Sequence, residues 1–179
     1  IFGLFYLGFL PSHWLKLRNL NYPDSFDGGQ LVPSSLGGIF SFGMVITLIA
    51  CLMIVASDIG SYCFGRMFGK HTLSPISPGK TVEGAIGGFI CAITMGSISG
   101  MIIRWPIGCL LGGLLGALVG VFALVGDLTE SMMKRNANLK DSGDALPGHG
   151  GILDRIDSYL FTPAVVYYAV NLLIAFFNV

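Results

Sequence analysis

Long apolar runs alternate with two polar segments along this chain. The runs without Asp, Glu, Lys or Arg are residues 28–57, 84–103, 105–126 and 158–179. A helix needs about 20 mostly apolar residues to cross the hydrocarbon core of a bilayer. The predicted membrane-spanning helices are therefore 36–57, 84–103, 106–126 and 159–178.

Residues 1–15 are also apolar, but this run is short and does not begin with methionine. We interpret it as the remaining part of a fifth span in a chain that lacks its N-terminal helices. The expected organisation is a single transmembrane domain over residues 1–179.

The composition agrees with a membrane protein. Of the 179 residues, 53% are hydrophobic and 11% are charged, against roughly 25% charged in ordinary soluble domains. A soluble globule would have too little polar surface to cover four such runs, and a disordered chain or a highly charged nucleic-acid binder is excluded. The predicted fold class is an all-α, polytopic integral membrane protein, with the bilayer and not nucleic acid as its partner.

The charges are concentrated in the two polar segments. Of the 20 charged residues, 15 lie between Asp58 and Glu83 or between Asp127 and Asp157. Two spans separate these segments, so both should emerge on the same side of the membrane and could share a site. Seven basic residues on that side, against three on the other, predict that it is cytoplasmic. Cytoplasmic polar loops are therefore expected to form the site. In a bacterium this would be the inner or plasma membrane. The seven are Arg66, Lys70, Lys80, Lys134, Arg135, Lys140 and Arg155, and the three are Lys16, Arg18 and Arg104.

Glycines recur at helical spacing within the predicted spans. The sets are Gly84/Gly88, Gly96/Gly100 and Gly112/Gly116/Gly120. In lipid, small residues let helix backbones approach closely, so we expect these positions to serve packing. The same faces would permit a homodimer.

The first polar segment places Asp58, Tyr62, Arg66 and Lys70 four residues apart, on one face of a helix. Charge spacing alone fits a solvated helix extension as well as it fits a surface for an anionic substrate. The following residues, 77–81, superficially resemble a phosphate-binding P-loop. However, Ser74 stands where the first glycine is required and no strand is expected before the loop, so Lys80 is better interpreted as a point charge for phosphate.

The second polar segment carries half of all the charges. Asp127, Glu130 or Ser131, and Lys134 share one helical face, and Asp154 and Asp157 lie where the last span begins. Asp127 and Asp154 are the preferred metal candidates, and oxygen-only ligands favour Mg²⁺. The alternative that these aspartates only cap helices or pair with Lys134 and Arg155 carries equal weight at this stage.

Residues 131–157 resemble the signature of the phosphatidate cytidylyltransferase family, also called CDP-diacylglycerol synthases. The positions that match in order and spacing are Ser131, Lys134-Arg135, Lys140-Asp141, Gly143, Pro147, His149-Gly150-Gly151, Asp154-Arg155 and Asp157. The stretches around residues 57–71 and 77–84 are similar to the same family. A pattern with this many fixed polar positions rarely arises by chance.

The resemblance implies that CTP and phosphatidic acid react to give CDP-diacylglycerol and pyrophosphate, with Mg²⁺ as cofactor and a second, monovalent cation left open. The implied catalytic set is Asp127, Asp154, Lys134, Arg135, Lys140, His149 and Arg155, with Asp127 and Asp154 on the metal. The implied substrate-binding set is Asp58, Arg66, Lys70, Lys80, Ser131, Asp141, Gly150, Gly151 and Asp157. Glu130, Asp141 and Asp157 are secondary ligand candidates, and His149 binds phosphate or assists proton transfer.

Alternatives from other classes were weighed. A transporter or channel would more often place its binding groups near the bilayer midplane, whereas the charges here gather on one side. A CDP-alcohol phosphotransferase would carry a multi-aspartate helical signature that is absent from this sequence. A purely structural role leaves the clustering of charges unexplained.

Overall fold

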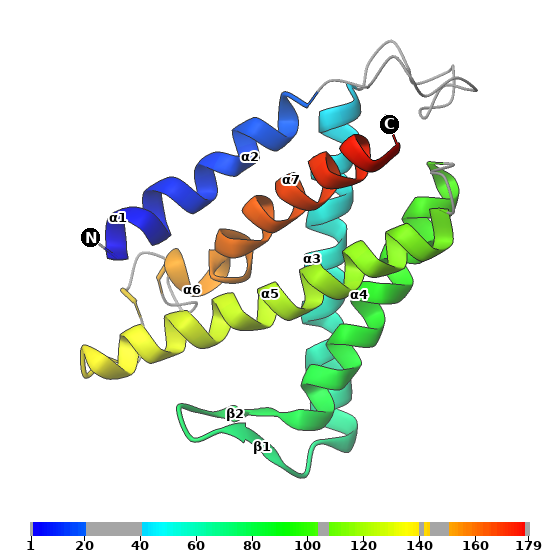
Figure 1. Ribbon diagram of the computed structural model, residues 1–179. Helices are drawn as coiled ribbons and strands as arrows, with labels where there is room; N and C mark the ends of the chain where they lie inside the picture. The colour runs from blue at the N-terminus through cyan, green and yellow to red at the C-terminus, as the bar shows by residue number, and fades with distance from the viewer. Residues whose placement is uncertain (1, 21–40, 104–107, 140–141, 144–150, 178–179) are drawn as a thin grey trace.

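The computed structural model describes residues 2–20, 41–103, 108–139, 142–143 and 151–177, and four long helices dominate it (Figure 1). They are α3 (Phe42–Phe68), α4 (Val82–Ile102), α5 (Gly108–Asn136) and α7 (Ser158–Phe177). Four helices of the described residues, the last of them counted from Leu153, are long and apolar enough to cross a membrane. The predicted all-α, polytopic membrane fold is confirmed.

The N-terminal residues form one continuous helical run along α7 (Figure 1). It consists of α1 (Phe2–Leu4), the π-helical turn η1 (Phe5–Phe9) and α2 (Leu10–Arg18). Tyr6 and Leu10 pack against Leu160 and Ala164 of α7. The run is not among the four long apolar helices, so its assignment to a fifth span stays a prediction.

Two helices extend beyond their predicted ends. The α3 helix begins after Ser41, whose hydroxyl accepts a hydrogen bond from the Met44 amide, and continues past residue 57 to Phe68. The α5 helix continues past residue 126 to Asn136. A charge marks where the apolar face of a helix stops, but it does not interrupt the backbone hydrogen bonds. Asp58 and Asp127 therefore stand on helices and not on loops.

A β-hairpin joins α3 to α4, which the sequence did not predict. Its strands are β1 (Thr72–Ser74) and β2 (Ser77–Thr81), paired antiparallel with Thr72 opposite Thr81. The expectation that no strand precedes residues 77–81 is therefore wrong. The segment is nevertheless no P-loop, because residues 77–81 form the second strand of this hairpin and not a phosphate-binding loop.

Glycines bring the backbones of α4 and α5 together, as their spacing predicted. A Cβ atom on Gly112 would collide with the carbonyl oxygen of Gly96, and one on Gly100 would collide with that of Gly108. The glycine faces of α4 and α5 are thus covered within one chain. A homodimer would need another surface, because the faces on which we based it are already occupied.

The core lies where α2, α3, α5 and α7 meet. Its buried residues include Leu17, Ile54, Val119 and Val166. Large apolar side chains such as Leu114 are exposed on the outer faces of the bundle. In a membrane protein these faces contact lipid, so the apolar exterior agrees with the predicted spans.

Candidate functional site

A polar cavity of about 560 Å³ lies where the hairpin, α3 and α4 meet the C-terminal part of α5 and the start of α7. This volume falls within the usual range of small-molecule sites, about 300 to 1,000 Å³. Its charged lining residues are Asp58, Arg66, Lys80, Asp127, Asp154, Arg155 and Asp157. Its uncharged lining residues are Ser57, Ser61, Tyr62, Gly65, Leu73, Gly79, Thr81, Gly84, Ala85, Gly120, Ala123, Leu124 and Ser158.

The two polar segments meet at this cavity, which confirms their predicted convergence. Lys80 on β2 forms an ion pair with Asp127 on α5. Arg135 at the end of α5 donates a hydrogen bond from Nε to the Ile76 carbonyl oxygen in the hairpin turn, at 3.2 Å. Residues separated by about 50 positions in the chain are thus brought together at one end of the bundle.

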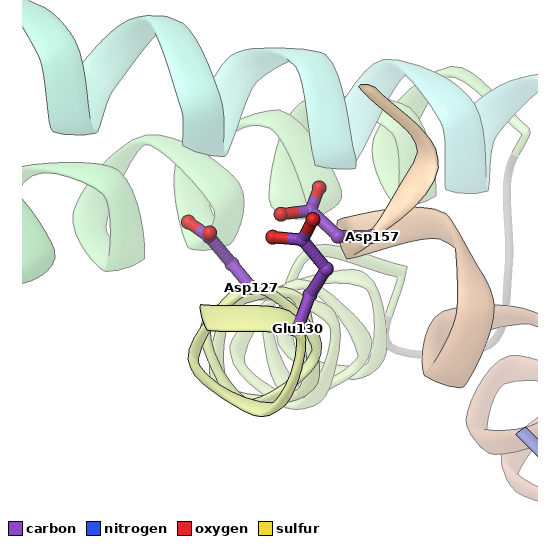
Figure 2. A group of neighbouring side chains, drawn as sticks. All are labelled: Asp127, Glu130 and Asp157. Atoms are coloured by element: carbon purple, nitrogen blue, oxygen red, sulfur yellow. The ribbon is translucent and has the colours of Figure 1, made fainter. Parts of the chain in front are cut away.

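Three carboxylates gather beside the cavity. Figure 2 shows Asp127 and Glu130 projecting from α5 and Asp157 approaching them from the start of α7. One oxygen from each lies within 4.8 Å of the other two. Glu130 is buried, and its Oε1 atom has no hydrogen-bond partner among the described residues.

The sequence explains how α5 and α7 can approach closely enough to form this cluster. Gly126 lies against the backbone of Asp157, where a Cβ would come within 2.5 Å of the Asp157 carbonyl oxygen. Asp127 and Glu130 are three residues apart and therefore share a helical face. Asp157 Oδ1 accepts a hydrogen bond from the amide of Ser158, the first residue of α7, at 2.7 Å.

Asp154 has a different environment. Its Oδ1 lies 2.7 Å from Lys134 Nζ, and its Oδ2 accepts hydrogen bonds from the amide and hydroxyl of Ser142 and from the amide of Gly151. Lys134 also forms an ion pair with Glu130 Oε2 at 2.8 Å. Asp154, in the short helix α6 (Leu153–Ile156), therefore connects α5 to Ser142 and Gly151 of the segment between α5 and α6. This geometry places Asp127 with Glu130 and Asp157, and it places Asp154 in a neighbouring network.

The remaining predicted site residues differ in whether they line the cavity and in what they contact. Lys70 donates its backbone amide to Glu83, and neither Lys70 nor the half-buried Ser131 lines the cavity. Arg135 contacts the hairpin turn as described, and Gly151 binds Asp154 through its amide. Lys140, Asp141, His149 and Gly150 lie outside the described residues.

Sequence reasoning assigned no site role to Glu83 or Ser142. Glu83 bonds Lys70 and His71, and Ser142 bonds Asp154, so their partners lie 12 or 13 positions away in the chain and no charge spacing reveals these contacts. Position was the one available signal, because Glu83 directly follows the Lys80-Thr81 stretch and Ser142 lies inside the signature.

Comparison with known proteins decides the family. The sequence model described as the cytidylyltransferase family matches residues 2–173. The chain belongs to the cytidylyltransferase family. It is 43% identical to a phosphatidate cytidylyltransferase from Synechocystis sp., with 99% of this chain aligned. It is 44% identical to a chloroplastic one from Arabidopsis thaliana and 36% identical to one from Bacillus subtilis, each over 93% of this chain.

The chain is shorter than these members of the family. It spans 63% of the Synechocystis protein, 44% of the Arabidopsis protein and 55% of the Bacillus protein. The matched portion nevertheless includes every described residue of the cavity.

Proposed function

We propose that this chain carries the active site of a phosphatidate cytidylyltransferase, which converts CTP and phosphatidic acid into CDP-diacylglycerol and pyrophosphate. The observation that carries the proposal is the cavity itself, in which carboxylates and cations from two polar segments meet at one end of four apolar helices. The relatives that bear this enzyme's name support it. They also favour it over a transporter or a CDP-alcohol phosphotransferase.

In the proposed reaction, a phosphate oxygen of phosphatidic acid attacks the α-phosphorus of CTP. A new phosphorus–oxygen bond forms, and the bond from the α-phosphorus to the oxygen that bridges the α- and β-phosphates breaks. Pyrophosphate leaves with that electron pair. The attacking oxygen is already anionic, so the protein need not supply a nucleophile, and positioning and charge stabilisation are its main tasks.

The carboxylate cluster fits a Mg²⁺ ion. Asp127, Glu130 and Asp157 offer oxygen ligands within reach of one ion, and the unpartnered Glu130 Oε1 would be costly to bury without a cation or a donor. We therefore assign Mg²⁺ to these three residues and not to the pair Asp127 and Asp154. When bound, Mg²⁺ would neutralise charge on the CTP phosphates and on the leaving pyrophosphate.

Cationic side chains of the cavity would hold the phosphates of the two substrates. Lys80, Arg66 and Arg155 line it from the hairpin, from α3 and from the segment before α7. Lys80 already faces Asp127, and the nucleotide phosphates would share this lysine with the carboxylate. Lys134 would have a different role. It forms ion pairs with both Glu130 and Asp154, so it links the carboxylate cluster to the hydrogen bonds around Asp154.

We also place the cavity on the cytoplasmic side of the membrane. The seven basic residues of the polar segments support this orientation. CTP would then arrive from the cytoplasm, and the lipid phosphate would reach the same cavity from the adjacent leaflet.

The direct test is synthesis by the purified protein in detergent or vesicles. Radiolabelled CTP, phosphatidic acid and Mg²⁺ should give labelled CDP-diacylglycerol, with no product when phosphatidic acid is omitted. A parallel reaction with CDP-diacylglycerol and an alcohol tests the phosphotransferase. Product in that reaction alone, or CTP-independent solute flux into vesicles, would overturn the proposal.

A further inference from the structure

The hairpin is one wall of the cavity. Leu73, Gly79, Lys80 and Thr81 all belong to this hairpin and all line it. An isolated two-stranded hairpin is at best marginally stable in water, so a wall built from strands this short needs support from outside. The described residues supply that support at the base of the hairpin and at its turn.

Glu83 supports the base. Its Oε2 accepts hydrogen bonds from the backbone amides of Lys70 at 3.2 Å and His71 at 3.3 Å, and its Oε1 lies 2.7 Å from His71 Nδ1. The next rung is a backbone bond from the Val82 amide to the His71 carbonyl oxygen at 3.0 Å. The Glu83 carboxylate therefore extends the ladder of the hairpin beyond its strands and joins the chain entering β1 to the first turn of α4.

Thr81, which pairs with Thr72 in the neighbouring rung, connects the hairpin to α4. Its hydroxyl accepts a hydrogen bond from the Gly84 amide at 3.1 Å and so caps α4. Glycines surround its side chain: a Cβ on Gly69 would lie 2.8 Å from Thr81 Cγ2, and one on Gly65 would lie 3.1 Å from Thr81 Oγ1. The backbone that follows Lys80 is therefore held in place at Thr81.

We propose that Glu83 is a positioning residue that clamps the base of the hairpin and thereby keeps Lys80 directed at Asp127 in the cavity. The role of Lys80 in this inference rests on the proposed function. A lysine side chain loses conformational entropy when it binds a phosphate. If the backbone is already fixed, less entropy is lost on binding and the affinity is higher. Glu83 touches no substrate and acts through Lys80.

A simpler role for Glu83 is stabilisation of the N-terminus of α4 by its negative charge, which is typical of acidic residues in a first helical turn. The two roles differ in what they predict. If Glu83 only stabilises the helix, its loss should lower the stability of the whole protein. If Glu83 is a clamp, its loss should increase hydrogen exchange in the hairpin and weaken the binding of CTP. The matched control is Ser41→Ala, which removes a helix N-cap that lies outside the cavity.

The first experiment measures hydrogen exchange of the purified protein. In Glu83→Ala, amides in residues 70–82 should exchange roughly tenfold faster, while those of residues 108–136 remain unchanged; the figure follows from losing hydrogen bonds to a charged acceptor. Glu83→Gln, which keeps the acceptor but not the charge, should give a smaller increase. Ser41→Ala should leave residues 70–82 unchanged. Unchanged hairpin exchange in Glu83→Ala would overturn the clamp.

The second experiment is a double-mutant cycle on the apparent KM for CTP. Glu83→Ala should raise this KM roughly tenfold in the presence of Lys80, and it should change the KM by less than about twofold in a Lys80→Ala background, because interacting residues are not additive. Equal effects in the two backgrounds would overturn the action through Lys80. If the unaltered protein makes no CDP-diacylglycerol, the proposed function fails, and hydrogen exchange still decides whether Glu83 clamps the hairpin.

Discussion

The two halves of α5 have different roles: one packs against α4, and the other carries the acidic side chains of the site. The N-terminal half contacts α4 through glycines whose backbones almost touch, as at Gly112 and Gly96. The C-terminal half carries Asp127 and Glu130, which face α7 and the cavity. In the first half, the absence of side chains at the glycines allows two helices to pack closely. In the second half, carboxylates that would be costly to bury alone are paired with lysines.

The comparison also separates stability from chemistry. Gly112 contributes no functional group, so a change there should act on folding. Asp127, Glu130 and Asp157 are the proposed Mg²⁺ ligands, so changes there should act on the reaction and leave the helix packing in place.

The largest effect is expected for Asp157→Asn. Removing one charged ligand should lower turnover about 10² to 10³-fold and raise the Mg²⁺ concentration for half-maximal activity about tenfold or more. Steady-state assays across a Mg²⁺ titration measure both quantities. Thr129→Ala removes a hydroxyl that donates a hydrogen bond to the Val125 carbonyl oxygen of its own helix, and it should keep wild-type kinetics. An unchanged Mg²⁺ requirement in Asp157→Asn would remove this residue from the metal set.

The scaffold half is tested by Gly112→Ala. The added methyl group meets the carbonyl oxygen of Gly96, so the two helices must separate, and we expect a loss of about 1 to 3 kcal/mol in the free energy of unfolding. Gly8→Ala is the matched control, because a Cβ there meets no atom within 4 Å. Thermal or denaturant unfolding in detergent measures the difference. Equal stability of the two variants would show that the glycine contact does not hold α4 on α5.

The third prediction contrasts Asp154 with Asp157. Asp154 bonds Lys134, Ser142 and Gly151, so Asp154→Asn should weaken the ordering of the loop and lower turnover about tenfold, with the Mg²⁺ requirement unchanged. Ser142→Ala removes only the hydroxyl contact and should lower turnover by about twofold. A shift in the Mg²⁺ requirement of Asp154→Asn equal to that of Asp157→Asn would return Asp154 to the metal set, as the sequence predicted.

Sequence reasoning was most successful where the signal is local. Apolar run length gave the four long helices, and the spacing of Gly96, Gly100 and Gly112 gave their close packing. Both signals arise from the lipid, which requires apolar faces and internally satisfied backbones.

The arrangement of the carboxylates depends on contacts that no local pattern records. Asp154 and Asp157 are three residues apart, and we preferred Asp154 as a ligand from the sequence although their spacing does not distinguish them. The proposed choice of Asp157 over Asp154 follows from two contacts. Gly126 allows the start of α7 to approach α5, and Lys134 binds Asp154. The hairpin was missed for a related reason, since its short strands contain Pro78 and Gly79 and lack the alternation typical of strands.

A small effect is expected for Arg135→Ala, and its size distinguishes the two interpretations of this residue. As a phosphate ligand, Arg135 would make strong charge-assisted bonds to CTP, and Arg135→Ala would raise the apparent KM for CTP about a hundredfold. In the structure its Nε instead donates one exposed hydrogen bond to the Ile76 carbonyl oxygen, and exposed hydrogen bonds of this kind contribute about 1 kcal/mol or less. We therefore expect the KM to rise by only about two- to fivefold. Arg135→Lys is the matched control: it keeps the charge but loses the Nε donor, so it should behave like Arg135→Ala if the hairpin contact is the role, and like the unaltered protein if positive charge is what matters.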